Sequence, residues 1–579
     1  TLSDNNLHTI ARFALIFIII LACFCAIIGK IIIIQYHERD IWLRIANNQV
    51  RTNVVIPASR GNILDSEGNI LASSMPQYIV TMDTRTQALH LGGDTLYKKY
   101  ADSIANGLSR IIGDKSGKEY RALMDASFRH KNKEGYSGKV TRLSKKQLTY
   151  IEMKQVKALP LVNRGVYKSG IQFEDLQLRI KPFGNLASKT IGAVNKKNGH
   201  GRAGLESFYD SYLTGKDGLG TRQRVGGRME IVTTKEAEDG LDVITNINTG
   251  LQDIVESTLR ERVEATQADW GCCILMETQT GKIRAISNLE RDNDDGTYYE
   301  QNNRAVMRVE PGSTFKTIAL MAALDDGKVE LYDTVSVSSN GWRYFNANHT
   351  DSHKKDTVYT TRSALAISSN IALAKIITRG YEGSAKKFVK KVKKFGLTDT
   401  INWEIPGAHS ARIEVPKDTV TLSRMAYGYS VELSPMQILM FYNAIANDGK
   451  MIQPYLVSEI QKDGKTIKTF ETETINKSIC SRSTLRDIRL CLHDVVWDDT
   501  LGTASVRWYG GKVIARKAQS DLVHIAGKTG TAQLLQRGHY CSTRHRMTFV
   551  GYFPEEAPRY TCICMIEYPK NISSQESKT

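Results

Sequence analysis

The sequence contains no Cys-x-x-Cys pair and no histidine spacing that resembles a zinc site, so we expect neither a metal nor a cofactor. Cysteine itself is sparse, with nine residues in 579. Two of the nine, Cys23 and Cys25, lie in an apolar N-terminal run, which leaves an odd number, seven, outside it. At least one of these thiols is therefore unpaired, and we expect buried free thiols. Cys480 and Cys491 are the pair best placed for a disulfide, and the sequence leaves open whether they form one.

The composition also lacks any strong bias. Hydrophobic residues make up 41% and charged residues 24% of the chain, and no internal repeat is present. These values are ordinary for a globular protein and exclude a disordered chain, a collagenous chain and a disulfide scaffold. A chain of 579 residues has room for roughly two to four domains of about 150 residues each.

Acidic residues are too few to balance the basic ones: 61 Asp plus Glu stand against 78 Lys plus Arg, a net charge of +17. Taken alone, this charge suggests a nucleic-acid partner. The densest basic run, residues 386–394, carries six lysines interleaved with Phe388, Val392 and Phe395 at helical spacing. This pattern predicts an amphipathic helix with a solvated lysine face. Contact with anionic lipid or an envelope polymer is the alternative, and we expect no nucleic-acid partner for a domain outside a membrane.

One long apolar run argues for a membrane. Residues 13–29 contain no charge, and after Lys30 the run continues to Ile34. As a helix, residues 13–34 rise about 33 Å, enough to cross a hydrocarbon core of about 30 Å. We therefore predict a short cytoplasmic stub and membrane anchor over residues 1–36. A cleaved signal peptide or a lipoprotein site at Cys23 fits less well, because the run is too long and the bulky Leu21 precedes the cysteine.

The predicted pattern of strands and helices changes near residue 236, so we divide the rest of the chain there. Residues 37–235 alternate short strands, turns and lysine-rich helices without any nucleophile and base, which is typical of a spacer domain. Residues 236–579 predict a strand at 242–247, a helix at 251–263 and a hairpin at 271–288. A long helical block follows, and strands return at about 528 and over 547–568. This order predicts an α+β fold, an antiparallel sheet whose first and last segments pair around inserted helices.

Three short motifs in the second half carry chemistry. Ser313 and Lys316 open a predicted helix, and their spacing places the amine and the hydroxyl on one face. Such a lysine activates a serine only if its pKa is lowered. Ser368 and Asn370 lie on a break between two helical stretches, where an ordinary helix cap would look the same. Alone, each motif is weak.

The third motif is Lys528-Thr529-Gly530-Thr531 in a predicted strand. The glycines on both sides of Lys528 and Thr529 allow another backbone to come close, so a peptide can add along this edge. Lys528 and the two threonine hydroxyls suit a carboxylate. A glycine-bulged strand without function is the alternative for this motif taken alone.

Together and in this order, the three motifs resemble those of penicillin-binding proteins and β-lactamases. The whole chain resembles more narrowly the class B penicillin-binding proteins, over about residues 10–570. The supporting segments are Arg60-Gly61-x-Ile63 with Asp65 and Gly68, Arg179-x-Lys181-Pro182, Ile191-Gly192, Gly204-Leu205-Glu206-x-x-Tyr209, Ser434-Pro435-Met436-Gln437, Asn447-x-Gly449 and 549–554. Lys181 departs from the family, which usually has tyrosine at this position.

The resemblance implies a peptidoglycan D,D-transpeptidase. Ser313 would attack the penultimate D-Ala carbonyl of a D-Ala-D-Ala stem peptide, with Lys316 as the base. Ser368, helped by Lys528, would pass the proton to the leaving amine, and Asn370 would hold the donor amide. A second strand's amine would then resolve the acyl-enzyme into a cross-link, and β-lactams would acylate the same serine.

The resemblance also implies how the substrate is held. Thr529, Gly530 and Thr531 would bind the donor, with the two hydroxyls on its terminal carboxylate. The backbone N–H groups of Ser313 and Thr531 would form the oxyanion hole. Residues 37–235 would be a non-catalytic pedestal, residues 236–579 the extracytoplasmic transpeptidase domain, and a separate glycan polymerase and divisome proteins the partners.

Two questions stay open at the level of sequence. The short linker and modest pedestal favour the division enzyme, of the penicillin-binding protein 3 type, over the elongation enzyme of class B. A β-lactamase or a D,D-carboxypeptidase shares the three motifs but does not need this pedestal. A β-lactam sensor also has an anchor, but it would need signalling segments on the other side of the membrane. Arg12 on one side of the anchor and Lys30, Arg39 and Arg44 on the other do not decide its orientation.

Overall fold

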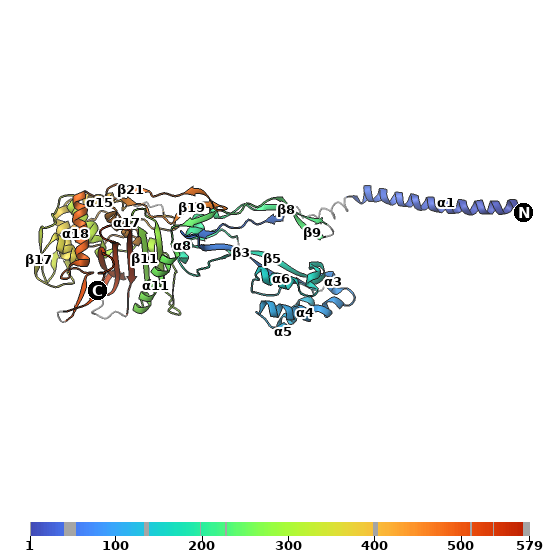
Figure 1. The fold of residues 1–579 in the computed structure, drawn as a ribbon, viewed down its shortest axis with the longest axis horizontal. Coiled ribbons are helices and arrows are strands. Elements are labelled where there is room, and N and C mark those ends of the chain that lie inside the picture. Colours follow the sequence, from blue (N-terminus) through green and yellow to red (C-terminus); the bar gives the residue numbers. More distant parts are fainter. Residues whose placement is uncertain are drawn as a thin grey trace. The chain divides into compact units, whose positions relative to one another are not determined.

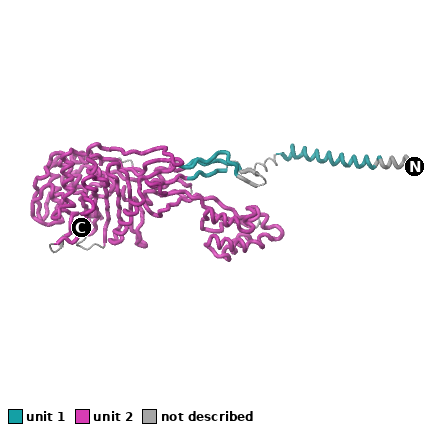
Figure 2. The backbone as a smooth tube through the Cα atoms, viewed as in Figure 1, with its two compact units in different colours: residues 1–59, 215–240 teal, residues 60–214, 241–579 magenta. Residues whose placement is uncertain are grey.

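The computed structural model describes residues 2–39, 54–131, 138–196, 198–225, 228–397, 403–509, 512–536 and 538–570. The chain forms two units, one of residues 1–59 and 215–240 and the other of residues 60–214 and 241–579 (Figures 1 and 2). The three predicted motifs all lie in the second unit.

The first unit begins with the predicted apolar helix. Helix α1 (Leu2–Ile32) continues as the π-helical turn η1 (Ile33–His37). Over Arg12–His37 it is long and apolar enough to cross a membrane, with a mean hydropathy of 3.0. This unit also contains a three-stranded antiparallel sheet of β1 (Val54–Ile56), β8 (Gly218–Val225) and β9 (Arg228–Lys235), in the order β1-β8-β9.

A six-stranded antiparallel sheet is the frame of the second unit, and it pairs the two ends of its C-terminal half as predicted. Its order is β13-β12-β11-β26-β25-β24. The strands are β11 (Trp270–Glu277), β12 (Ile283–Arg291), β13 (Tyr298–Tyr299), β24 (Ala526–Gln536), β25 (His539–Phe553) and β26 (Tyr560–Glu567). Gly281, with φ +79°, makes the predicted turn between β11 and β12. Strand β24 is an edge strand, because within the described residues it pairs only with β25.

The helical block between β13 and β24 packs on one face of this sheet. Its elements are η3 (Arg304–Val306), η4 (Gly312–Thr314), α12 (Phe315–Asp325), β14 (Thr334–Val337), β15 (Trp342–Tyr344), β16 (Ala347–His349), β17 (Thr357–Thr360), α13 (Thr361–Ala366), α14 (Asn370–Tyr381), α15 (Ala385–Lys394), α16 (Thr419–Met425), α17 (Pro435–Ala446), β18 (Met451–Ile452), β21 (Thr474–Asn476), α18 (Arg482–Trp497), β22 (Val506–Tyr509) and β23 (Lys512–Arg516). Helices α12, α14 and α17 share one buried core with Cys272 and Ile274 of β11 and Val550 of β25.

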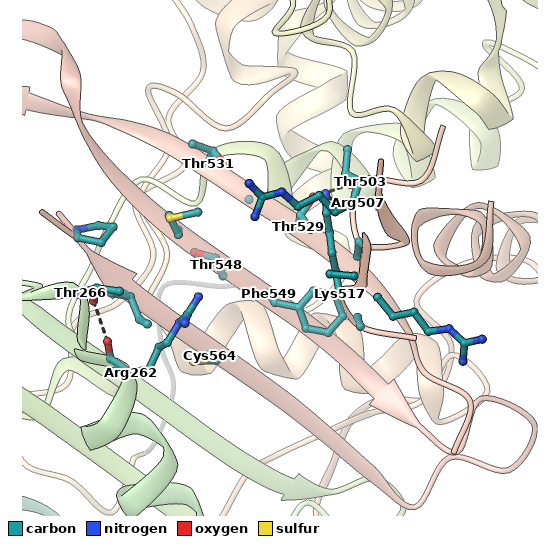
Figure 3. Close-up of a pocket in the computed structure, with 18 residues that line it drawn as sticks. Arg262, Thr266, Thr503, Arg507, Lys517, Thr529, Thr531, Thr548, Phe549 and Cys564 are labelled. Atoms are coloured by element: carbon teal, nitrogen blue, oxygen red, sulfur yellow. Dashed lines mark hydrogen bonds between the residues drawn. The ribbon is translucent and has the colours of Figure 1, made fainter. Parts of the chain in front are cut away.

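The opposite face of the sheet is covered by α11 (Thr249–Thr266), which packs on Cys273, Cys562 and Ile566. A small second cluster on this face joins the end of α18 to Phe549 of β25. Between these two contacts, this face of the sheet borders a cavity of about 550 Å³, which is lined by Thr529 and Thr531 of β24 and by the hairpin β22–β23 (Figure 3).

A second sheet joins strands of the N-terminal half of the second unit to β10, β19 and β20, and a separate core cluster includes Val80, Leu108 and Tyr120. The sheet has the order β20-β19-β10-β2-β3-β4, with β5 paired to β3. Its strands are β2 (Ile63–Leu64), β3 (Ile70–Asp83), β4 (Val140–Arg142), β5 (Ile171–Ile180), β10 (Asp242–Thr245), β19 (Val457–Lys462) and β20 (Lys465–Thr469). The other elements are α3 (Gln87–His90), α4 (Thr95–Ile112), α5 (Gly117–Phe128), α6 (Tyr150–Lys157), η2 (Val162–Arg164), α7 (Val166–Ser169), α8 (Ser188–Ile191), β6 (Ala193–Val194), β7 (Gly201–Ala203), α9 (Gly204–Phe208) and α10 (Asp210–Leu213).

A buried ion network joins three of the segments that carry the sequence resemblance. The Glu206 carboxylate is fully buried and accepts from Arg60 Nε at 2.8 Å and from Arg179 Nε at 2.6 Å. The network ties the start of β2 and the end of β5 to helix α9. A buried carboxylate of this kind is tolerated because both of its oxygens are paired.

Two expectations for single residues are settled by the fold. All nine cysteines are free, and Cys480 and Cys491 are both buried thiols rather than a disulfide. His539, Arg544, His545 and Arg546 follow the Lys-Thr-Gly segment, and as a polar cluster they predict a solvated loop. They lie instead in the long strand β25, so this prediction is wrong. The Arg546 guanidinium instead donates to Glu567 and to the Glu310 carbonyl oxygen.

Candidate active site

Ser313 lies at the beginning of helix α12, within the 3₁₀ turn η4. Its side chain is half-buried, whereas Lys316, one turn later, is fully buried. The Tyr442 hydroxyl fixes this turn by donating to the Thr314 carbonyl oxygen, and it lies 2.8 Å from the Thr317 hydroxyl. The predicted pairing of a serine at a helix start with a lysine on the same helix is therefore present.

Ser368 lies on the break between α13 and α14, as predicted, with a left-handed backbone (φ +58°). A residue with a side chain pays about 1–2 kcal/mol for this conformation, and such strain is typical of functional sites. The conformation is held by Lys316, whose Nζ donates to the Ser368 carbonyl oxygen at 2.5 Å and to Oγ at 3.0 Å.

Lys528 reaches the same hydroxyl from the other side. It is fully buried in strand β24, and its Nζ donates to Ser368 Oγ at 3.0 Å and to the Thr529 carbonyl oxygen at 2.9 Å. One serine oxygen thus accepts from two lysine amines that are far apart in the sequence. The structure brings Lys316, Ser368 and Lys528 into one hydrogen-bonded group, and Ser313 lies one helical turn before Lys316.

Burial determines the charge of these lysines. Loss of water around the ammonium lowers the pKa of Lys316 to about 7, and the nearby Asp351 carboxylate only partly opposes this effect. Burial, together with the charge of Lys316, also holds the pKa of Lys528 well below its usual value. Near neutral pH the site therefore contains a neutral amine that can accept a proton.

The Asp351 carboxylate is a site residue that the sequence did not indicate. It accepts from the Ser369 hydroxyl at 2.6 Å and from the backbone N–H groups of Asn370 and Ile371 at 2.6 and 3.1 Å. These contacts place a negative charge at the N-terminus of α14, where the helix dipole favours it. The carboxylate orients the segment that carries Ser368 and Asn370. No short motif surrounds Asp351, so only the folded chain reveals it.

Asn370 itself lies in the first turn of α14. Its side-chain amide donates to the Thr350 carbonyl oxygen at 2.8 Å. Among the described residues, none donates to the side-chain oxygen of the same amide, so this oxygen can accept from a peptide N–H.

The segment from Thr529 to Thr531 approaches the Ser313 turn closely. A Cβ at Gly530 would lie 2.9 Å from Thr314 Cγ2, so only glycine lets strand β24 pass this near the serine. The Thr529 hydroxyl lies 2.6 Å from that of Thr503. Because β24 is an edge strand, an extended peptide can lie along it beside Ser313.

Gly312, directly before the serine, also lies close to strand β24. Gly312 has φ +54°, and a Cβ there would lie 2.7 Å from Ala532 Cβ. Turn η4 and strand β24 are therefore packed backbone to backbone. Within the described residues, no group of three His, Cys, Asp or Glu side chains is arranged to hold a metal ion.

Such an arrangement suits acyl transfer. A half-exposed serine lies at a helix N-terminus, one turn before a buried lysine whose pKa is lowered to about 7. A second hydroxyl is shared by two lysines, and a free strand edge can hold a peptide. Fold and site together define a serine acyltransferase.

Comparisons with known proteins agree with this class. Residues 271–579 match the model of the penicillin-binding protein transpeptidase domain, and residues 55–245 match the penicillin-binding protein dimerisation domain. The chain belongs to the class B penicillin-binding proteins, and it is a peptidoglycan D,D-transpeptidase of the serine type.

Individual relatives are distant but cover much of the chain. The chain is 24% identical over 573 residues to the "Probable peptidoglycan D,D-transpeptidase PbpC" of Pseudomonas aeruginosa, covering 97% of this chain and 91% of that one. It is 26% identical over 403 residues to the "Peptidoglycan D,D-transpeptidase FtsI" of Buchnera aphidicola, covering 68% and 65% of the two chains. Penicillin Binding Protein 2X of Streptococcus thermophilus has a similar fold, with a TM-score of 0.73 and 22% identity over 91% of this chain and 78% of that one.

Proposed function

We propose that this transpeptidase works through an acyl-enzyme on Ser313. The observation that carries the proposal is the Ser368 hydroxyl, held at 3.0 Å by both Lys316 and Lys528. Neutral Lys316 takes the Ser313 proton as Oγ attacks the penultimate D-Ala carbonyl carbon. Ser368 then relays a proton to the amine of the leaving D-Ala.

The substrate is held by the edge of β24. The terminal carboxylate of the donor binds the hydroxyls of Thr529 and Thr531, and Gly530 gives the peptide room. The backbone N–H groups of Ser313 and Thr531 stabilise the oxyanion, an effect worth about 10²–10³ in rate for each donor. The Asn370 side chain holds the donor's amide, with its side-chain oxygen accepting from the donor's N–H.

Covalent labelling by a fluorescent penicillin tests the function. A β-lactam mimics the donor's acyl group, so we expect stoichiometric labelling of the purified protein. The label should persist for many turnovers of the natural reaction, because the trapped acyl group blocks the acceptor. No label would refute the proposed function, and rapid spontaneous release would favour a β-lactamase.

We further propose that the chain is anchored by residues 13–34 in the cell (inner) membrane, with the pedestal (37–235) and the transpeptidase domain (236–579) on the outer side. It acts in septal synthesis with a separate glycan polymerase and divisome proteins, and β-lactams inhibit it. The short linker and modest pedestal support the division role. Peptidoglycan, the substrate, lies outside the cytoplasm, and this supports an orientation with the transpeptidase domain on the outer side of the membrane.

The cellular position of the protein distinguishes the two class B roles. A fluorescent fusion that complements loss of the native protein should concentrate at the division septum. Depletion should produce filaments, since septal cross-linking would stop while growth continues. Uniform lateral fluorescence and rounded cells would show the elongation role instead.

A further inference from the structure

Three cysteine side chains lie together on the face of the six-stranded sheet that α11 covers. Cys273 of β11 is directly opposite Cys564 of β26, and Cys562 lies two residues before Cys564 on the same face. The sulfur atoms of Cys273 and Cys562 are 3.8 Å apart. Cys272 points to the other face, into the core shared with the helical block. We refer to Cys273, Cys562 and Cys564 as the thiol cluster.

The thiol cluster borders the cavity of about 550 Å³ on this face. Cys564 lines this cavity together with Arg262 and Thr266 of α11 and Met547 of β25 (Figure 3). Cys564 is partly exposed, whereas Cys273 is buried. Cavities of this size hold small organic molecules. One thiol of the cluster therefore faces a space that a small molecule can enter, and a second thiol lies opposite it in the sheet.

The cavity is strongly cationic. Its lining includes Arg262, Arg507, Arg516 and Lys517, and none of its lining residues is acidic. Arg516 is paired with Asp521, and Lys517 Nζ donates to the Thr503 carbonyl oxygen. Burial, and after it the charge of Arg507, lower the pKa of Lys517. A positive field of this kind favours an anionic molecule over a neutral or a cationic one.

Hydrogen bonding within the thiol cluster divides its protons unequally. The Cys273 thiol donates to the sulfurs of Cys562 and Cys564, and these contacts together with burial hold its pKa well above the usual value. The contact with Cys273 and the charge of Arg262 lower the pKa of Cys564, against the opposing effect of burial. A thiolate is the attacking species in thiol–disulfide exchange. Cys564 is therefore the first of the three to react, and Cys273 follows.

The strand register also suits a bond between these two residues. Directly opposed residues of antiparallel strands have Cα atoms about 4.5–5.5 Å apart. A disulfide spans Cα separations of about 4.4–6.8 Å. Cys273 and Cys564 are such an opposed pair, so joining their sulfurs needs a rotation of side chains rather than a shift of the backbone.

We propose that the thiol cluster is a thiol–disulfide exchange site whose substrate is a small disulfide with a carboxylate on each half. The Cys564 thiolate attacks one sulfur of this disulfide, forms a mixed disulfide and releases one half as a thiolate. Cys273 gives its proton to that thiolate and attacks Cys564 Sγ. This step closes a Cys273–Cys564 disulfide and releases the second half. The two cysteines are oxidised by two electrons in total, and the small disulfide is reduced to two thiols.

Three small disulfides of different charge test the site on the purified full-length protein. Dithiodipropionate is anionic, hydroxyethyl disulfide is neutral and cystamine is cationic. Reaction at Cys564 is followed by acid quenching and peptide mass spectrometry, which separates it from reaction at the other cysteines. Each rate is divided by the rate of the same disulfide with mercaptoethanol, which removes differences in intrinsic reactivity. We expect the normalised rate to be at least about tenfold higher for dithiodipropionate than for cystamine, with the neutral reagent between them.

Variants separate the roles of the two reacting thiols. In the wild type, the product should contain a Cys273–Cys564 bond and no added mass. Cys273→Ser keeps the attacking thiol, so one half of the reagent should remain attached to Cys564. Cys541→Ser removes a partly exposed thiol of β25 outside the thiol cluster, and it should behave as the wild type.

The source of the charge preference is tested at the cavity wall. Arg262→Gln should lower the preference for dithiodipropionate over cystamine by at least about threefold. Lys512→Gln removes one charge from an exposed position on the hairpin, outside the cavity lining, and it should keep the wild-type preference.

The wild type alone supplies the decisive results, so the test does not depend on any variant folding. No reaction at Cys564 in the folded protein, or equal normalised rates for the three reagents, overturns the proposal. A stable mixed disulfide in the wild type, or a bond through Cys562, overturns it as well. Ser313 takes no part in this chemistry, so labelling by penicillin tests the proposed function separately.

Discussion

Ser313→Ala is expected to lower transpeptidation by at least about 10⁴-fold, since loss of a nucleophile leaves only binding and oxyanion stabilisation. The Lys316, Ser368 and Lys528 group remains in place, because none of its hydrogen bonds uses Ser313. The reaction is measured as D-Ala released from a D-Ala-D-Ala peptide together with the cross-linked product.

Ser257→Ala is the matched control, since this serine is exposed on α11. It should retain full activity, and both variants should keep the thermal midpoint of the wild type. Substantial turnover by a folded Ser313→Ala protein would show that another group is the nucleophile.

Acylation by penicillin is expected to rise with pH through about 7 and to level above it. The folded pKa of Lys316 is lowered to about 7, so below this pH the amine already holds a proton and cannot accept another from Ser313. Above this pH the neutral amine predominates, and further increases add nothing. Stopped-flow acylation rates across the range provide the profile, and a rate that is flat from about pH 6 to about pH 10 would contradict this role for the amine.

Lys316→Gln should lower the acylation rate by about 10²–10⁴-fold, the usual contribution of a positioned base, and should remove the rise near pH 7. Lys387→Gln, on the exposed face of α15, is the control for loss of one lysine. The control should keep both the rate and the profile. A Lys316→Gln protein that retains the rise would assign it to another group.

Periodic segments were predicted well from the sequence because packing demands their pattern. The helix around residues 386–394 is present as α15, with Phe388, Val392 and Phe395 fully buried. The hairpin over 271–288 and the pairing of β11 with β26 were also correct. The helix and the hairpin are each encoded locally, the helix by its apolar repeat and the hairpin by its apolar strands and a glycine turn.

The candidate site could be assembled from the sequence only in part. Ser313, Lys316, Ser368 and Lys528 belong to short motifs, and the structure joins the last three by hydrogen bonds. Which lysine contacts which oxygen depends on packing across the chain, as when Lys528 reaches Ser368 from β24. No spacing rule predicts that contact.

Residues without a motif escaped prediction altogether. Asp351 acts through the backbone N–H groups of Asn370 and Ile371 at the start of α14, and it comes from a different segment of the chain. The polar residues His539 to Arg546 suggested a loop, whereas the sheet extends through them as β25 because their backbone pairs with β24 and β26. Tertiary pairing outweighed local polarity in that strand.

Mass spectrometry of the acyl-enzyme tests the central claim most directly. The purified protein is mixed with a D-Ala-D-Ala peptide donor, quenched in acid and digested. The account predicts that the peptide containing Ser313 gains the mass of the donor without its terminal D-Ala, and that penicillin blocks this addition. An adduct on a different residue, or D-Ala release with no covalent intermediate under rapid quenching, would contradict it.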